Sequence, residues 1–207
     1  ENTPNATISY YTKGALVALC LDLTLRAQGK ATLDDVMRAL WARCKGGPMT
    51  EADLSATLKE LGGRAYTREL TAWVHGTREL PLQPLLEGAG VQVQEDAAAV
   101  QQSLGLRTAD SGGVLQVKTV LRGGAAEQAG FAAGDEWLGI EVGGEGWRIT
   151  KLDDLSLYAG PHRKLTAVVA RDRRLLRLEL ALPAAATTWR LSIGKAERVR
   201  AWLAGDT

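Results

Sequence analysis

The first ninety residues carry apolar side chains at the spacing of helices. The polar opening ends at Ser9, which can cap a helix that extends to about Arg26. Apolar residues surround this helix on nearly all sides, so it is expected to need neighbours all round. The same spacing predicts further helices in the segments LDDVMRALWARC, LSATLKEL, TRELTAWVHG and LPLQPLLEGAG.

Start signals support two of these helices. Thr32 precedes the second helix, and Asp34 and Asp35 occupy its first turn, where the helix dipole favours negative charge. Thr50 and Asp53 imitate a capping box ahead of the third helix. The second helix is expected to bury one apolar face, made of Leu33, Val36, Met37, Leu40 and Trp41.

The periodicity changes near residue 91. VQVQ alternates as a strand does, and strand-like segments follow in GGVLQVKTVL, DEWLGIEV, LTAVVARD and RLLRLELAL. Two short helical segments, GAAEQAG and LDDLSLY, interrupt them. We therefore predict an α+β protein with a helical unit at 1–94, a small β domain at 95–183 and a tail at 184–207 that ends in the short helix KAERVRAWL.

Bulk composition argues against several classes of partner. The 207 residues are 45% apolar and 24% charged, a globular balance, and the net charge is +1. This charge gives no reason to expect nucleic acid or an anionic membrane as a partner. The sequence has no charge-free apolar run of ~18 residues, so no membrane span is expected.

The chain contains two cysteines, Cys20 and Cys44. Each lies among apolar helical residues, so we expect two reduced, buried thiols and a cytoplasmic location. Two cysteines do not exclude an exported location such as the periplasm. The chain begins at Glu1, and its opening ENTPNAT lacks the apolar core of a secretory signal. Such a start suggests a piece of a longer polypeptide.

Residues 98–183 carry short motifs in a fixed order: SLGL at 103–106, then VLRGGAAEQAGFAAGDEWLGIEV, ITKLDDLSLY and LTAVVARDRRLLRLELAL. Their order and spacing resemble those of a PDZ domain. The resemblance implies that a peptide adds as an extra strand beside Leu106. Leu104, Gly105 and Leu106 would then receive the peptide terminus, with Lys151 or Leu152 at the helix position that sets specificity. From the residues alone, the alternative is that both leucines are core and Gly105 forms a turn.

A further motif, Tyr11-x-Lys13-Gly14, opens the long apolar helix. It is similar to a motif of thermolysin-like zinc aminopeptidases. The segment LGGRAYTRELTAWVHGTRELPL also resembles the glycyl aminopeptidase family, whose members carry a C-terminal PDZ domain. This resemblance implies that the phenol of Tyr11, or as second choice that of Tyr10, stabilises the oxyanion formed during peptide hydrolysis. Ordinary packing at the start of a helix is the alternative.

The resemblance implies zinc in the full-length parent and none bound by this segment. In the family a His-Glu-x-x-His helix and a downstream Glu bind zinc, whereas His75 and His162 belong to no such motif. We therefore predict the C-terminal portion of a zinc aminopeptidase that is inactive alone. Its expected partners are the N-terminal catalytic portion of the same chain and a peptide or protein substrate. The alternative is a non-catalytic PDZ adaptor that binds the C-termini of partner proteins.

Overall fold

The computed structural model describes residue 5 and residues 10–110, 112–184 and 186–204. The protein has a mixed α+β fold, as the sequence predicted, and its strands pair mostly antiparallel. Cα packing divides the chain into two compact units. One, here called the helical unit, contains Ser9–Gln94 and Trp189–Thr207, and the other, the β unit, contains Glu1–Ile8 and Glu95–Thr188. The domain limits expected from the sequence stay predictions.

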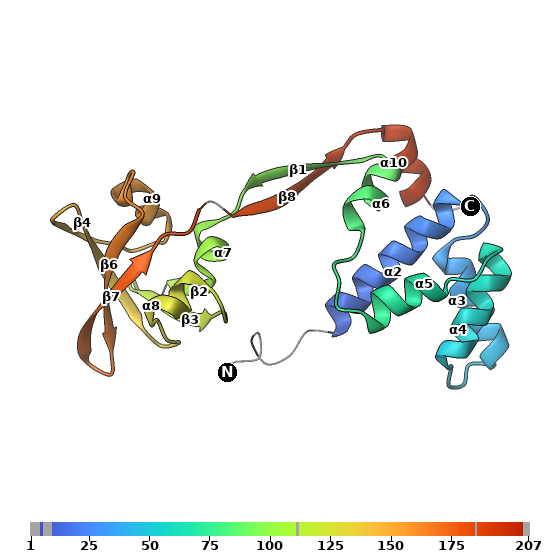
Figure 1. Ribbon diagram of the computed structural model, residues 1–207, viewed down its shortest axis with the longest axis horizontal. Coiled ribbons are helices and arrows are strands. Elements are labelled where there is room, and N and C mark those ends of the chain that lie inside the picture. The colour runs from blue at the N-terminus through green and yellow to red at the C-terminus, as the bar shows by residue number, and fades with distance from the viewer. Residues whose placement is uncertain (1–4, 6–9, 111, 185, 205–207) are drawn as a thin grey trace. The chain divides into compact units, whose positions relative to one another are not determined.

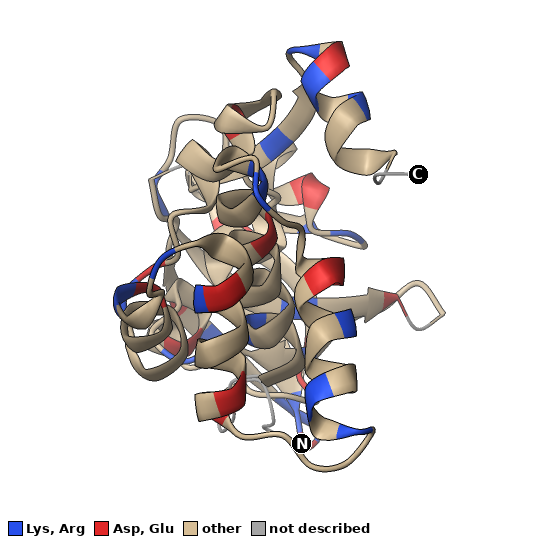
Figure 2. Ribbon diagram, turned by 90° about the vertical axis from the view of Figure 1, so that its right-hand side faces the viewer, with Lys and Arg blue, Asp and Glu red and all other residues tan. Residues whose placement is uncertain are grey.

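The helical unit is built on the long helix α2, drawn in blue in Figure 1. Acidic and basic residues are interspersed on the helices that face the viewer in Figure 2. Apolar side chains from four of its segments form one core, which consists of Val17, Leu21, Leu25, Val36, Leu40, Leu58, Tyr66 and Leu70. Its elements are α2 (Tyr10–Ala27), α3 (Leu33–Cys44), α4 (Glu51–Gly62), α5 (Thr67–Glu69), η1 (Leu70–His75), α6 (Leu82–Gly88) and α10 (Ala196–Leu203).

Side-chain caps fix the starts of α3 and α4. The hydroxyl of Thr32 accepts a hydrogen bond from the Asp35 backbone N–H, and the Asp35 carboxylate accepts one from the Thr32 backbone N–H. Thr50 and Asp53 form the same reciprocal pair at α4. These capping boxes satisfy backbone donors that the first helical turn leaves without partners.

Three local expectations for the helical unit were wrong in detail. Met37 and Trp41 of α3 are exposed, because the face of the helix that packs on the core carries Val36 and Leu40. Cys20 is buried, whereas Cys44 at the end of α3 is partly exposed. The predicted fourth helix is α-helical only over α5 and continues as the π-helix η1, whose wider turn is common at functional sites.

The β unit contains an antiparallel sheet with the strand order β2-β3-β4-β6-β7, and β5 pairs with β4. The strand β2 therefore ends the sheet on one side. Short helices accompany the strands. The elements are α7 (Val100–Leu104), β2 (Leu106–Asp110), β3 (Leu115–Val120), α8 (Ala125–Ala129), β4 (Glu136–Val142), β5 (Glu145–Arg148), α9 (Asp153–Ala159), β6 (Lys164–Arg171) and β7 (Arg174–Ala181).

Trp137 lies at the centre of the β-unit core. Its ring packs against Phe131 with the ring centroids 4.7 Å apart, and its indole N–H donates to the Gly139 carbonyl. Next to it, the fully buried Asp135 carboxylate receives two hydrogen bonds from the Arg171 guanidinium, at 2.7 and 2.8 Å. A buried charge held by a two-pronged partner in this way fixes the strand β6 against the turn before β4.

A separate two-stranded sheet joins β1 (Val91–Ala97) to β8 (Thr187–Ile193). Hydrogen bonds at its two ends, from Ala98 N to Ala186 O and from Gly194 N to Gly90 O, show that the strands run antiparallel. The strand β8 was not expected from the sequence. None of the helices in the described part of the chain has the length and hydropathy of a membrane-spanning segment.

Candidate functional site

Tyr10 and Tyr11 form the first turn of α2, where both side chains point largely into solvent. Their rings pack against each other with centroids 4.3 Å apart. Tyr11 is 76% exposed and Tyr10 is 74% exposed. A hydrogen bond with Tyr11 is the main cause that raises the pKa of the Tyr10 phenol. Because neither ring is buried in the helical-unit core, both phenols are accessible to a ligand that approaches this end of α2.

Lys13 fixes this end of α2 to the segment after η1. Its ammonium donates a hydrogen bond to the Gly76 carbonyl over 2.8 Å. Gly76 is required there, because a Cβ atom would lie 2.3 Å from the Ala72 carbonyl oxygen. Gly14, in contrast, has open space at its Cβ position among the described residues. The lysine of the motif is thus an anchor for the turn that carries Tyr11.

The SLGL segment joins α7 to β2. Leu104 ends α7 and Leu106 begins β2, and both are 1% exposed within the β-unit core. Gly105 between them has a φ of 70°, which favours glycine, and a Cβ atom would lie 3.0 Å from the Gly124 Cα. The tight contact explains the glycine by backbone packing.

The backbone of the same loop is engaged in hydrogen bonds. The Ser103 N–H donates to the Ala99 carbonyl over 3.1 Å, and the Gly105 N–H donates to the Gln102 carbonyl over 3.2 Å. The Gly105 carbonyl accepts from Leu121 N over 2.7 Å. A peptide carboxylate at this loop would therefore compete with the hydrogen bonds of α7 and of its C-cap for these N–H groups, whereas the outer edge of β2 is the end of the sheet.

Lys151 and Leu152 stand immediately before α9. Leu152 is buried in the same core as Leu104 and Leu106, while Lys151 is exposed. The Asp154 carboxylate accepts from the backbone N–H groups of Thr150 and Lys151, and the bond from Thr150 is the main cause that lowers the pKa of Asp154. The structure thus brings the predicted leucines together as core and leaves Lys151 at the surface.

The histidines lie in separate places. His75, at the end of η1, lies 2.9 Å from both carboxylate oxygens of Glu51, and His162 is exposed in a turn after α9. Across residues 10–110, 112–184 and 186–204, as well as residue 5, the structure brings no three His, Cys, Asp or Glu side chains together as potential metal ligands. The described residues therefore do not fit a zinc site.

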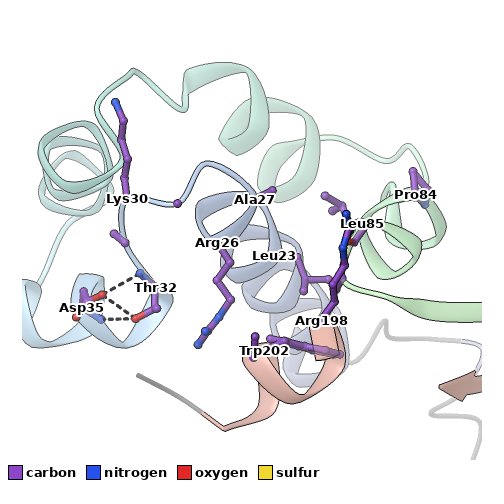
Figure 3. A pocket seen from close by; sticks show the side chains of 15 residues that line it. Leu23, Arg26, Ala27, Lys30, Thr32, Asp35, Pro84, Leu85, Arg198 and Trp202 are labelled. Carbon is purple, nitrogen blue, oxygen red and sulfur yellow. Dashed lines mark hydrogen bonds between the residues drawn. The ribbon is translucent and has the colours of Figure 1, made fainter. Parts of the chain in front are cut away.

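Sequence reasoning missed a cavity of about 560 Å³ inside the helical unit. Figure 3 shows Arg26 of α2 between the Thr32–Asp35 cap and Trp202 of α10. Asp22 accepts hydrogen bonds from the Arg26 Nε at 2.8 Å and from the Trp202 indole at 3.3 Å. The charge of Arg26 is thus already balanced by an acid.

A cleft of about 520 Å³ lies elsewhere in the helical unit, along α5 and η1 and the segment that follows them. Sequence reasoning missed this cleft too, because its charged residues are scattered over eleven positions. Its lining consists of Thr67, Arg68, Thr71, Ala72, Gly76, Thr77 and Arg78.

Comparison with solved structures finds a similar chain in an aminopeptidase N family protein. A crystal structure described as an aminopeptidase N family protein from Idiomarina loihiensis matches with a TM-score of 0.82 and 29% sequence identity. The match covers 98% of this chain and 37% of that chain, so this chain spans just over a third of that protein. No family model and no curated protein matches the sequence. A fragment of an aminopeptidase-like protein, as predicted, fits this likeness, while zinc and a PDZ domain stay predictions.

Proposed function

We propose that this chain is a portion of a zinc-dependent peptidase of the aminopeptidase type and that Tyr11 is its oxyanion donor. The observation that carries the proposal is the likeness to an aminopeptidase N family protein over 98% of the chain. The motif Tyr11-x-Lys13-Gly14 at the exposed start of α2 supports the assignment of the tyrosine. Since the described residues do not fit a zinc site, residues outside them would hold the metal.

The proposed role of Tyr11 follows from where charge develops in peptide hydrolysis. When a nucleophile attacks a peptide carbonyl, the oxygen gains negative charge that is absent in the substrate. A phenol O–H directed at that oxygen binds the transition state more strongly than the ground state and so raises kcat. The Lys13–Gly76 hydrogen bond would hold the first turn of α2 in place while Tyr11 donates. The exposed ring of Tyr11 leaves its phenol accessible to a substrate.

The test is Tyr11→Phe in the longer polypeptide that contains the metal-binding portion. Removal of one oxyanion donor is expected to lower kcat by about 10² to 10³-fold and to leave KM nearly unchanged. Tyr10→Phe is the matched control, because it removes the adjacent exposed phenol and is expected to change kcat by less than about threefold. Zinc content is measured in each variant by metal analysis. Undiminished kcat in Tyr11→Phe at full zinc content would refute the role.

We also infer that the β unit is a PDZ-like module that adds a peptide to the edge of β2. The position of β2 at the end of the sheet supports this, since no other strand among the described residues pairs with its outer edge. A titration of the 207-residue chain with peptides that end in apolar residues is followed by NMR. Saturable shifts in the amides of residues 106–110 are expected, and amidation of the peptide terminus is expected to weaken them. Shifts confined to other strands would exclude β2 as the docking edge.

A further inference from the structure

The α5–η1 cleft, defined above by its seven lining residues, is rich in positive charge. It contains two arginines, Arg68 and Arg78, and no Asp or Glu among its lining residues. Both arginines are exposed, and within the described part of the chain neither guanidinium has an ion-pair or hydrogen-bond partner. Among the neighbouring acids, Glu69 is paired with Arg64 and also interacts electrostatically with Arg68, and Glu79 follows Arg78 at the surface. Two unpaired guanidinium groups on one cleft favour an anionic ligand.

The remaining polar groups of the α5–η1 cleft are donors that suit the same kind of ligand. Thr67 and Thr71 lie four residues apart, on one side of the helical segment, and Thr77 lies on the segment after it. Their exposed hydroxyls can donate to an oxyanion beside the guanidinium groups. Ala72 and the stems of the arginines supply apolar surface, so the cleft can contact both the charged end and the side chain of a peptide.

The cleft shares one residue with the anchor of the Tyr11-bearing turn. Gly76 lines the cleft, and its carbonyl accepts the hydrogen bond from Lys13 of α2. At this point η1 ends, and Gly76 packs against the Ala72 carbonyl too closely for any side chain. The arginine cleft and the first turn of α2 are therefore linked through the hydrogen bond from Lys13 to the Gly76 carbonyl.

We propose that Arg68 and Arg78 bind the carboxylate end of a short peptide substrate. This inference rests on the proposed peptidase function and specifies its substrate class as short peptides with a free C-terminal carboxylate. Arginine matches a carboxylate with two parallel N–H donors, which gives orientation as well as affinity. The two arginines would thus determine specificity by the free carboxylate and take no part in the chemical step.

The test measures binding by the 207-residue chain, without zinc and without turnover. Glycyl-leucine and glycyl-leucinamide are titrated separately at low ionic strength, and backbone amide shifts of residues 67–78 are followed by NMR. The free carboxylate is expected to bind about tenfold more tightly than the amide, because a charge-assisted hydrogen bond is lost in the latter. Increasing salt is expected to reduce this preference, since the cleft is open to solvent.

The double variant R68Q/R78Q is expected to bind both dipeptides equally, with its amide spectrum otherwise as dispersed as that of the wild type. The matched control is R163Q/R174Q, which removes two exposed arginines of the β unit and changes the net charge by the same amount. It is expected to keep the tenfold preference. An unchanged preference in R68Q/R78Q, or no preference in the wild type, would overturn the proposal.

Two further arms separate the ligand class from general anion binding. Acetate and inorganic phosphate are titrated under the same conditions, and each is expected to shift the amides of residues 67–78 at least about tenfold more weakly than glycyl-leucine. Equal binding of either ion would replace the peptide site by a general anion cleft and would contradict the proposal. Because these measurements involve no catalysis, their failure is distinct from a failure of Tyr11→Phe, which leaves the dipeptide titration untouched.

Discussion

The two sites expected from sequence motifs differ in one measurable property, the exposure of their side chains. Tyr11, at the start of α2, is 76% exposed, whereas Leu104 and Leu106, in the SLGL segment, are each 1% exposed. Both motifs were read from a resemblance to known families. Tyr11 presents its side chain to solvent, whereas the leucines of the SLGL segment do not, and of the predicted peptide-binding residues Lys151 is exposed.

This difference teaches how each hypothesis must be tested. A substitution at Tyr11 removes a phenol from the surface and therefore reports on chemistry with little change in stability. A substitution at Leu104 or Leu106 opens a cavity in the β-unit core. If such a variant lost peptide binding, the loss could not be separated from the effect of the disturbed packing. Peptide addition to the β unit has to be followed at the backbone of β2, where no core side chain is changed.

The largest expected effect is the difference in unfolding free energy between a substitution at Leu106 and one at Tyr11. Leu106→Ala is expected to lower the free energy of unfolding by about 2–5 kcal/mol, because the leucine is fully buried and its neighbours can close the cavity only in part. Tyr11→Phe is expected to change the free energy of unfolding by less than about 0.5 kcal/mol. Urea unfolding of both variants, followed by the NMR signals of each unit, measures the two values.

The contrast between a buried Leu106 and an exposed Tyr11 would be contradicted if Leu106→Ala left the free energy of unfolding nearly unchanged. A loss of unfolding free energy below about 1 kcal/mol would mean that Leu106 contributes little to the core. Its side chain would then be available to contact a peptide. A loss of several kcal/mol in Tyr11→Phe would mean, in turn, that the exposed phenol is a structural group. Arg107→Gln is a useful reference on β2, since it changes an exposed neighbour of Leu106 without opening a cavity.

Features that depend on a few neighbouring residues could be predicted from the sequence. The start of α4 at Thr50 follows from a reciprocal pair only three residues apart, and the end of α4 follows from Gly63 in the left-handed region. The strand β5 was missed, although Gly143 and Gly144 with positive φ angles form the two-residue hairpin loop that joins it to β4.

Features that depend on distant partners could not be predicted in the same way. The strand β8 pairs with β1, which lies about a hundred residues earlier in the chain. Without knowledge of this partner, the segment of β8 was predicted as part of the tail. The alternation of Trp189, Leu191 and Ile193 was the available signal. For the candidate sites, the sequence motif was enough to select Tyr11. The hydrogen bond from Lys13 to the Gly76 carbonyl joins residues 63 positions apart, so it could be found only in the folded structure.

The smallest expected effect is the difference in unfolding free energy between variants of the two capping boxes of the helical unit. Thr32 is buried and Thr50 is exposed, so water can replace the lost hydroxyl at α4 but not at α3. Thr32→Ala is therefore expected to cost about 1 kcal/mol of unfolding free energy at neutral pH, and Thr50→Ala is expected to cost less.

The pH dependence of the same variants separates the carboxylate from the rest of the cap. Hydrogen bonds from the backbone N–H and the hydroxyl of Thr32 lower the pKa of Asp35. A lowered folded-state pKa contributes stability that is fully present above the unfolded pKa, about 3.9, and is lost as the pH falls through the folded value. The stability difference between wild type and Thr32→Ala is thus expected to narrow from pH 7 to pH 2.5 in urea unfolding. A difference that stays constant over this range would show that the Thr32 hydroxyl does not stabilise the Asp35 carboxylate and that the cap acts only through the Asp35 N–H bond.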